Sequence, residues 1–311
     1  MIPSFYFSGK TNHENRITTF IHKYSNFCSK NCFKGTLLDK ESKNPIVYAN
    51  ISFLKQKKGI SSTEDGTFEL EITKKDLDKK VHVSCLNYKD TIVLVKDLMN
   101  KTLYLSPNLY ELKEIVISKK LSKEVVVDKY KRKNIKTSFG ARKGSPWIIT
   151  KLFKYKESYE ETPYVKDVTV YFGSWMMRKK GKFRVRIYSV DEITKKPKDD
   201  LIRDNIIVEV RKNHGKIKVD ISKYNIEVPE EGFYVGVERL EIPYNFHEYT
   251  YTMQGSKKKR KAIAVAPSIG AVYTTDSIYI YSRGKWRQFF APKQFQKGYN
   301  IQPAISVTLS N

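Results

Sequence analysis

The sequence predicts an all-β protein with two β-sandwich domains, and three observations support this prediction. Short segments rich in Val, Ile, Tyr and Phe recur between turn residues, and no long helical pattern interrupts them. Several segments alternate, such as Phe183–Tyr188, whose apolar face is expected to pack on a core while its charged face meets water. The length of 311 residues, 40% of them hydrophobic, suffices for two domains with separate cores.

The first sandwich is predicted from a run of strands and turns between Gly35 and Leu70. An Asn44-Pro45 turn precedes the alternating strand Ala49–Leu54, and an Asp65-Gly66 turn precedes a second alternating strand. Asp-Gly is a strong hairpin signal because Gly adopts a positive φ without steric cost. We therefore expect paired strands in this part of the chain.

This order of elements resembles the carboxypeptidase-regulatory-like domain, a small transthyretin-like Greek-key sandwich common in cell-envelope proteins of Bacteroidetes-type bacteria. The resemblance covers residues 33–117, where Val81–Tyr88 is similar to the family's strand and turn and Leu112–Ile117 to its closing strand. Asn87 stands where the family usually has Gly, and Asn tolerates a left-handed backbone better than other residues do. The resemblance implies a non-catalytic module located in the periplasm or cell envelope.

Residues 1–32 are predicted to be a poorly structured N-terminal segment. It contains no apolar run of signal-peptide length, so either the start codon is misassigned or the protein stays in the cytoplasm. Cys28 and Cys32 either form a disulfide in an oxidising compartment or are two free thiols. Cys85 is expected to be a small, buried side chain in a core strand.

Residues 118–146 are predicted to be a basic linker between the two sandwiches. Between residues 118 and 145, ten Lys and Arg residues occur against two acidic ones. Gly140, Gly144 and Pro146 interrupt regular structure at its end. One short strand or helix is expected within it, near Val125–Lys129.

The second sandwich is predicted to span residues 147–311 as a jelly-roll-like antiparallel fold. Nine short strands are expected: Trp147–Lys154, Lys166–Phe172, Lys182–Val190, Ile206–Val210, Gly215–Asp220, Gly232–Leu240, Ala262–Ala266, Ser277–Tyr281 and Ala304–Leu309. Three segments, Lys182–Asp191, Val219–Ile226 and Gly232–Glu238, resemble a jelly-roll module of uncharacterised function that follows regulatory-like domains in the same bacteria. Its general shape is similar to that of carbohydrate-binding sandwiches, although shape alone does not transfer a ligand.

The net charge of +25 arises mainly from lysines that are spread along the whole chain. It indicates either a generally solvated basic surface or an anionic partner, such as a polysaccharide or lipopolysaccharide phosphates. Nucleic acid is disfavoured, because no aromatic platform or recognition helix accompanies the basic segments. No apolar run reaches the roughly 18 residues that a membrane-spanning helix needs, and the sequence makes no prediction of oligomeric state.

Motifs for catalysis, cofactor binding and metal binding are not found in the sequence. The five histidines form no H-E-x-x-H pattern, and no nucleophile elbow, phosphate-binding loop or dinucleotide fingerprint occurs. We therefore expect no enzyme activity, no cofactor and no metal. The alternative is a hydrolase of peptides or glycans whose site the sequence does not reveal.

Binding is the better-supported class, and two tryptophans near turns are its candidates. Trp175 and Trp286 offer aromatic faces on which sugar C–H groups stack, and Lys285 and Arg287 flank Trp286 and could meet acidic sugars. The alternative for both tryptophans is packing in the core or at its rim.

A basic run forms the second candidate binding site, made of Lys257, Lys258, Lys259 and Arg260. It is either a charged hairpin tip or a contact for phosphate or acidic polysaccharide. Together these features predict a non-enzymatic, envelope-associated binding or scaffolding protein whose partner is a cell-surface or envelope glycan or protein. Polyanion binding through the basic loops is the further alternative.

Overall fold

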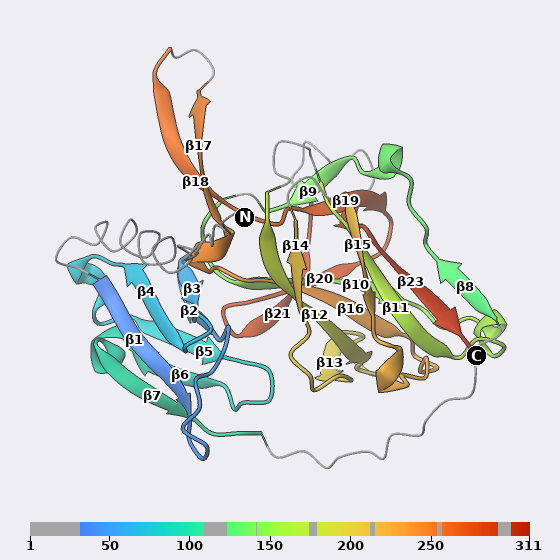
Figure 1. Ribbon diagram of the computed structural model, residues 1–311, viewed down its shortest axis with the longest axis horizontal. Helices are drawn as coiled ribbons and strands as arrows, with labels where there is room; N and C mark the ends of the chain where they lie inside the picture. The colour runs from blue at the N-terminus through green and yellow to red at the C-terminus, as the bar shows by residue number, and fades with distance from the viewer. Residues whose placement is uncertain are drawn as a thin grey trace, which may run out of the picture.

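The computed structural model describes residues 32–108, 123–140, 142–173, 179–211, 215–253, 257–291 and 300–311. Two β-sandwiches lie side by side, and a two-stranded hairpin projects away from the larger one (Figure 1). Among the described residues the single α-helix is one turn long, α2 (Val95–Leu98). The prediction of an all-β sandwich fold is confirmed.

The first sandwich consists of a three-stranded and a four-stranded sheet. Their strands, in spatial order, are β4 (Thr67–Glu71), β1 (Cys32–Asp39) and β7 (Lys101–Leu105) in one sheet, and β3 (Gly59–Ser61), β2 (Asn50–Phe53), β5 (Lys80–Ser84) and β6 (Thr91–Leu94) in the other. Phe33 and Leu37 from β1 meet Ile51 and Val83 from the second sheet in one apolar core. The core positions follow the period of two expected of strands.

The two left-handed turns that the sequence indicates are present. Gly66 has φ +76°, and a Cβ there would lie 2.5 Å from the carbonyl oxygen of Leu37, so only Gly fits. Asn87 has φ 69°, as expected from its place in the family's turn. Both predictions are confirmed.

The second sandwich has a seven-stranded sheet facing two smaller ones. The large sheet contains β13 (Pro197–Asp200), β12 (Gly181–Val190), β16 (Phe233–Arg239), β10 (Trp147–Phe153), β20 (Ile278–Ser282) and β21 (Lys285–Phe289), with β14 (Ile207–Val210) paired to β12. The facing sheets contain β15 (Lys216–Asp220), β11 (Tyr164–Tyr171), β23 (Ile305–Ser310) and β8 (Glu124–Val127), and β22 (Asn300–Pro303), β19 (Ile269–Thr274) and β9 (Thr137–Phe139). Each of the nine predicted strands overlaps an observed one.

The projecting hairpin and five 3-10 turns complete the described elements. The hairpin pairs β17 (Phe246–Thr252) with β18 (Lys259–Val265). The turns are η1 (Lys74–Asp76), η2 (Arg132–Asn134), η3 (Glu157–Tyr159), η5 (Ser222–Tyr224) and η6 (Pro243–Asn245).

The region predicted as a linker differs from that prediction. Its described part contributes β8 and β9, which pair with β23 and β19 of the second sandwich. The fully buried Lys151 holds this segment, because its Nζ lies 2.8 Å from the Asp128 carboxylate and 2.7 Å from the Tyr130 hydroxyl and also donates to the Ile305 carbonyl. The basic composition of this segment therefore gave no indication that it packs on the second sandwich.

The cysteines that the structure describes differ in state. Cys32 at the start of β1 is disulfide-bonded, whereas Cys85 is a free thiol. Cys85 directly follows β5 and is partly buried: it packs against the core of the first sandwich and also lines a cavity. Cys28 and the rest of residues 1–31 lie outside the described residues.

Candidate functional site

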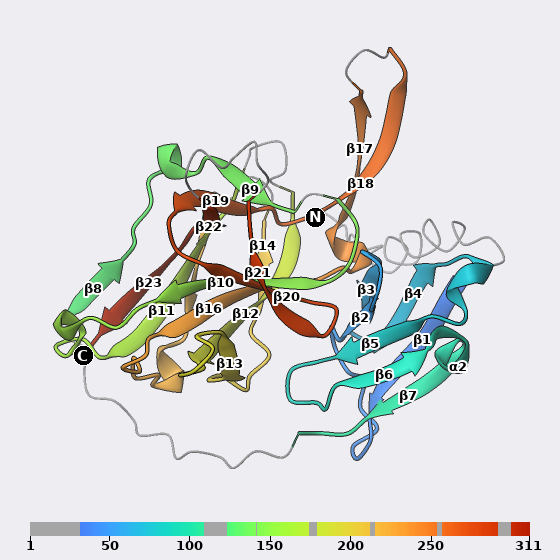
Figure 2. The same cartoon turned by 180° about the vertical axis from the view of Figure 1, so that it is seen from behind.

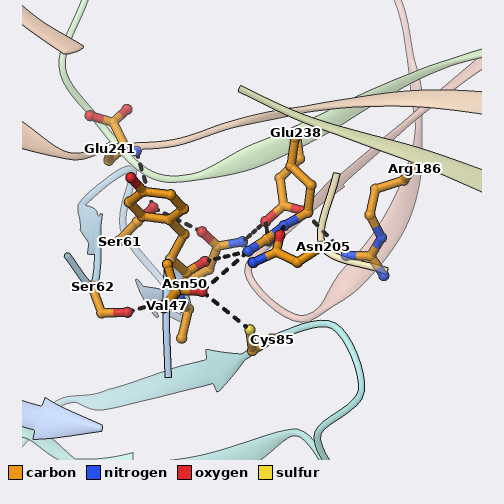
Figure 3. Close-up of polar contacts among 12 residues, drawn as sticks. Val47, Asn50, Ser61, Ser62, Cys85, Arg186, Asn205, Glu238 and Glu241 are labelled. Carbon is orange, nitrogen blue, oxygen red and sulfur yellow. Dashed lines mark hydrogen bonds and ion pairs between the residues drawn. The ribbon is translucent and has the colours of Figure 1, made fainter. Parts of the chain in front are cut away.

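The two sandwiches meet on the outer face of the seven-stranded sheet. Arg184 on β12 donates to the carbonyls of Val47 and Tyr48 in the first sandwich, at 3.3 and 3.2 Å. Asn50 on β2 donates to Glu238 Oε1 at 2.6 Å, and Arg184 donates to the same oxygen at 2.7 Å. Figure 3 shows these polar groups converging between the sandwiches. The interface is therefore built on a buried network of charged hydrogen bonds.

This network corrects the expectation that the charged face of Phe183–Tyr188 meets water. Arg184 and Glu238 are fully buried, because the first sandwich covers that face. Asn205 accepts a further hydrogen bond from Arg184 Nε at 2.6 Å (Figure 3). Alternation in the sequence places Arg184 and Arg186 on one face, but it does not show what covers them.

Glu238 stays ionised inside this network. Burial alone raises the pKa of its carboxyl, but the guanidinium groups of Arg184 and Arg186 outweigh burial and bring the pKa below its usual value. A buried carboxylate with two arginine partners and the Asn50 amide is satisfied electrostatically.

A second contact lies at the turn between β20 and β21. Gly284 has φ +78°, and a Cβ there would lie 3.0 Å from the His82 ring of the first sandwich, so the turn packs directly on that ring. Asp90 Oδ2 lies 2.9 Å from His82 Nε2 and accepts a hydrogen bond from the Tyr281 hydroxyl at 3.1 Å. A third contact joins Asn87 Nδ2 to the Arg203 carbonyl at 2.7 Å.

A cavity of about 300 Å³ lies between these contacts. Its floor is the outer face of β12, β16, β20 and β21, and its roof is the segment from Ser84 to Asp90 of the first sandwich. Both sandwiches are thus needed to form it. Sites at the junction of two domains are common places for small ligands.

Three aromatic side chains form one wall of the cavity. The Trp286 ring lies 5.3 Å from that of Tyr188 and 5.2 Å from that of Tyr281, both in edge-to-face geometry. Trp286 is only partly buried, so it packs on its neighbours and also lines the cavity. These contacts agree with the packing interpretation of Trp286, and its contact with a ligand stays a prediction.

Tyr188, one of these three residues, has a buried hydroxyl whose hydrogen bonding is not explained by the described residues. Tyr188 is 3% exposed, and its hydroxyl oxygen has no hydrogen-bond partner among the described residues. A buried polar group without a partner costs about 1–3 kcal/mol, so native proteins rarely leave one unless something else satisfies it. The neighbouring Tyr234, directly paired with Tyr188 across the sheet, donates to the Lys195 carbonyl at 2.7 Å.

Arg186 organises the charged side of the cavity. Its Nε donates to Asp200 Oδ1 at 2.6 Å, its second nitrogen pairs with the other Asp200 oxygen, and its third lies 3.2 Å from Glu238 Oε2. Both carboxylates are therefore held by one guanidinium in fixed positions.

The other candidates from the sequence lie elsewhere. Arg287 donates to the carbonyl and hydroxyl of Ser282 at 2.6 and 2.9 Å, and Lys285 is exposed on the same hairpin, so neither lines the cavity. Trp175 lies outside the described residues. The basic run is on the projecting hairpin, with Lys257, Lys258, Lys259 and Arg260 all exposed.

Sequence reasoning missed most of the cavity. Tyr188, Arg186 and Asp200 come from β12 and β13, and Tyr281 from β20. Their only signal was the polar face of an alternating strand, which is equally typical of a solvated surface.

Comparison with known proteins addresses the first sandwich. Residues 33–117 match the family model of the CarboxypepD_reg-like domain. This region is a carboxypeptidase-regulatory-like domain. The resemblance proposed for it from the sequence is confirmed, and the strands β1–β7 described above are its fold. No curated protein matches the chain.

Two kinds of feature are absent from the described residues. No group of three or more His, Cys, Asp or Glu side chains within the described ranges is arranged to hold a metal ion. No helix in the same part of the chain is long and apolar enough to cross a membrane.

Proposed function

We propose that this is a non-enzymatic binding protein that holds one end of a glycan, or a small sugar, in the cavity between its sandwiches. The observation that carries the proposal is Tyr188, which lines the cavity against the Trp286 ring and whose buried hydroxyl has no hydrogen-bond partner among the described residues. A ligand hydroxyl would satisfy it.

The chemistry of the lining suits a sugar. Sugar rings have apolar C–H faces that pack on aromatic rings, which Trp286 and Tyr281 supply. They also carry hydroxyl groups that both donate and accept, and the fixed Asp200 carboxylate and Arg186 guanidinium offer one acceptor and one donor group. A volume of about 300 Å³ is at the small end of ligand sites, which favours one or two sugar rings over a long chain.

The state of the carboxylates supports binding over hydrolysis. A glycosidase needs one carboxyl that keeps a proton to donate to the leaving group. Arg184 and Arg186 hold the Glu238 pKa below its usual value, and the Arg186 fork engages both Asp200 oxygens. Glu238 is therefore not suited to act as the general acid.

We place the protein in the periplasm or cell envelope within the same proposal. The regulatory-like domain resembles modules of envelope proteins, and the second sandwich resembles the jelly-roll module that follows such domains in Bacteroidetes-type bacteria. The disulfide of Cys32 supports an oxidising compartment. Scaffolding of other envelope components is compatible with this location.

Calorimetric titration with a defined sugar panel tests the proposed function. The panel contains glucose, galactose and N-acetylglucosamine with their disaccharides, and the proteins are the unmodified chain, Trp286→Ala and Lys285→Ala. We expect at least one sugar to bind, Trp286→Ala to abolish binding, and Lys285→Ala, which changes the same hairpin outside the cavity, to retain it. Absence of any binding, or equal binding by Trp286→Ala, would overturn the proposal, and cleavage of a disaccharide would favour the hydrolase.

A further inference from the structure

The β17–β18 hairpin is a ribbon without a partner sheet over its outer half. Seven residue pairs join the strands, from Phe246 opposite Val265 to Thr252 opposite Lys259. Both views show it extending away from the two sandwiches (Figures 1 and 2). Near its base, Arg142 forms an isolated bridge to Ala264, and the Lys143 amide donates to the Ile263 carbonyl at 3.1 Å. An isolated two-stranded ribbon is marginally stable in water, so its length calls for an explanation.

The outer half of the ribbon is strongly basic. Lys257 to Lys261 are five consecutive cations, all exposed, and Glu248 is the single acidic residue between Phe246 and Val265. No ion pair among the described residues involves Lys259, Arg260 or Lys261. Adjacent like charges repel, so this exposed run of cations concentrates positive potential on the ribbon.

The register distributes these charges on both faces. Lys259 and Lys261 lie opposite Thr252 and Thr250 on one face, while Arg260 lies opposite Tyr251 on the other. A chain of anionic groups could therefore contact the ribbon from either side.

We propose that the outer half of this ribbon binds an acidic polysaccharide, that is, a glycan chain bearing carboxylate, sulfate or phosphate groups. This site is separate from the cavity and does not depend on its ligand. Long-range attraction to repeated negative charges, with hydroxyl contacts from Thr250 and Thr252, matches what the ribbon presents.

The aromatic side chains of the ribbon favour a glycan over single-stranded nucleic acid. Readers of single strands stack bases on free aromatic faces. Here the Arg142 guanidinium lies 5.8 Å from the centre of the Tyr251 ring, and the Tyr249 ring lies 6.0 Å from the same ring. Both rings are partly buried by these contacts, so neither offers an open platform.

The exposed apolar groups favour a glycan over an anionic lipid surface. Elements that lie on membranes bury an apolar face between the lipids in addition to using their charges. On the described part of the ribbon, Met253 is the one large hydrophobic side chain that is more than one-third exposed. A single side chain at 46% exposure provides little insertion energy.

Binding to heparin tests the ribbon, with a variant of matched charge as control. The ribbon variant is Lys259→Gln with Arg260→Gln and Lys261→Gln. The control is Lys74→Gln with Lys75→Gln and Lys80→Gln, which removes three exposed positive charges from the first sandwich. Both variants have the same net charge, so a difference between them reports position and not total charge.

We expect the ribbon variant to bind heparin at least about tenfold more weakly than the control at about 0.15 M salt. We also expect its slope of log affinity against log salt to fall by about 2–3 relative to the unmodified protein. Equal weakening by the two variants would overturn the proposal, as would tighter binding of a 20-nucleotide oligothymidine or of phosphatidylglycerol vesicles than of heparin. Trp286→Ala should retain heparin binding, which keeps this outcome independent of the cavity.

Discussion

The two faces of the seven-stranded sheet both contain fully buried residues but are chemically different. On the inner face Val185, Ile187 and Val235 belong to the apolar core of the second sandwich. On the outer face Arg184 and Glu238, from the same two strands, are buried just as completely under the regulatory-like domain. The difference teaches that burial alone does not define a core: the inner face provides stability through packing, and the outer face depends on complete hydrogen bonding.

Of the substitutions that test this comparison, Glu238→Gln should cause the largest loss of unfolding free energy. It leaves the Arg184 and Arg186 guanidinium groups buried without their shared carboxylate, which costs about 3–5 kcal/mol of unfolding free energy. The inner-face change Ile187→Val removes one methyl group and should cost about 0.5–1.5 kcal/mol. Urea unfolding of the two variants measures both values. An equal or smaller loss for Glu238→Gln would mean that the outer face is not organised by its charges.

The pH dependence of stability should distinguish two buried glutamates of the interface. Burial raises the pKa of Glu241, and its partner Arg239 compensates only in part, so the carboxyl pKa stays above its usual value. Consistent with this, Glu241 Oε2 and Arg239 Nε have no hydrogen-bond partner among the described residues. The pKa of Glu238 is shifted in the opposite direction and lies below its usual value.

The sign of each effect follows from proton linkage. Folded Glu241 binds its proton more tightly than the unfolded chain does, so its ionisation lowers stability as pH rises above about 4.5. Folded Glu238 binds its proton less tightly, so its contribution is present above that value and is lost as pH falls below it. Relative to the unmodified protein, Glu241→Gln should therefore gain stability with rising pH, and Glu238→Gln should lose it. Urea unfolding at several pH values measures this. If the unfolding free energy of both variants changed with pH in the same way, this assignment would be contradicted.

The smallest effects on stability should come from the paired tyrosines. Tyr234→Phe removes the hydrogen bond to the Lys195 carbonyl and should cost about 0.5–1.5 kcal/mol. Tyr188→Phe removes a hydroxyl that has no partner in the described residues, so stability should stay constant or rise slightly. Thermal unfolding of the two variants side by side measures the difference. A larger loss for Tyr188→Phe would show that its hydroxyl already has a partner within the protein.

Much of the fold could be predicted from the sequence because its signals are local. Short apolar segments between turn residues located nine strands, and the left-handed turns at Gly66 and Asn87 follow from which residues accept a positive φ. Within the predicted linker the short strand expected near Val125–Lys129 is present as β8, but its pairing with the second sandwich was not foreseen, because nothing local in the sequence indicates that Lys151 and Asp128 pair.

The cavity was largely beyond sequence reasoning for the same reason. Trp286 could be singled out because it stands near a turn beside charged residues. Tyr188 and Arg186 could not, because their alternating pattern is the same whether water or a second domain covers that face. A cavity between two domains is a property of their packing, and a single sequence carries no record of it.

The most direct test of the proposed cavity site compares the same two tyrosines in ligand binding. The disaccharide that binds most tightly in the calorimetric panel is titrated into the unmodified protein, Tyr188→Phe and Tyr234→Phe. If the Tyr188 hydroxyl awaits a ligand, Tyr188→Phe should bind about 2–10-fold more weakly, which corresponds to one hydrogen bond, and Tyr234→Phe should bind as the unmodified protein does. Equal affinities in all three proteins, or a loss confined to Tyr234→Phe, would contradict the account.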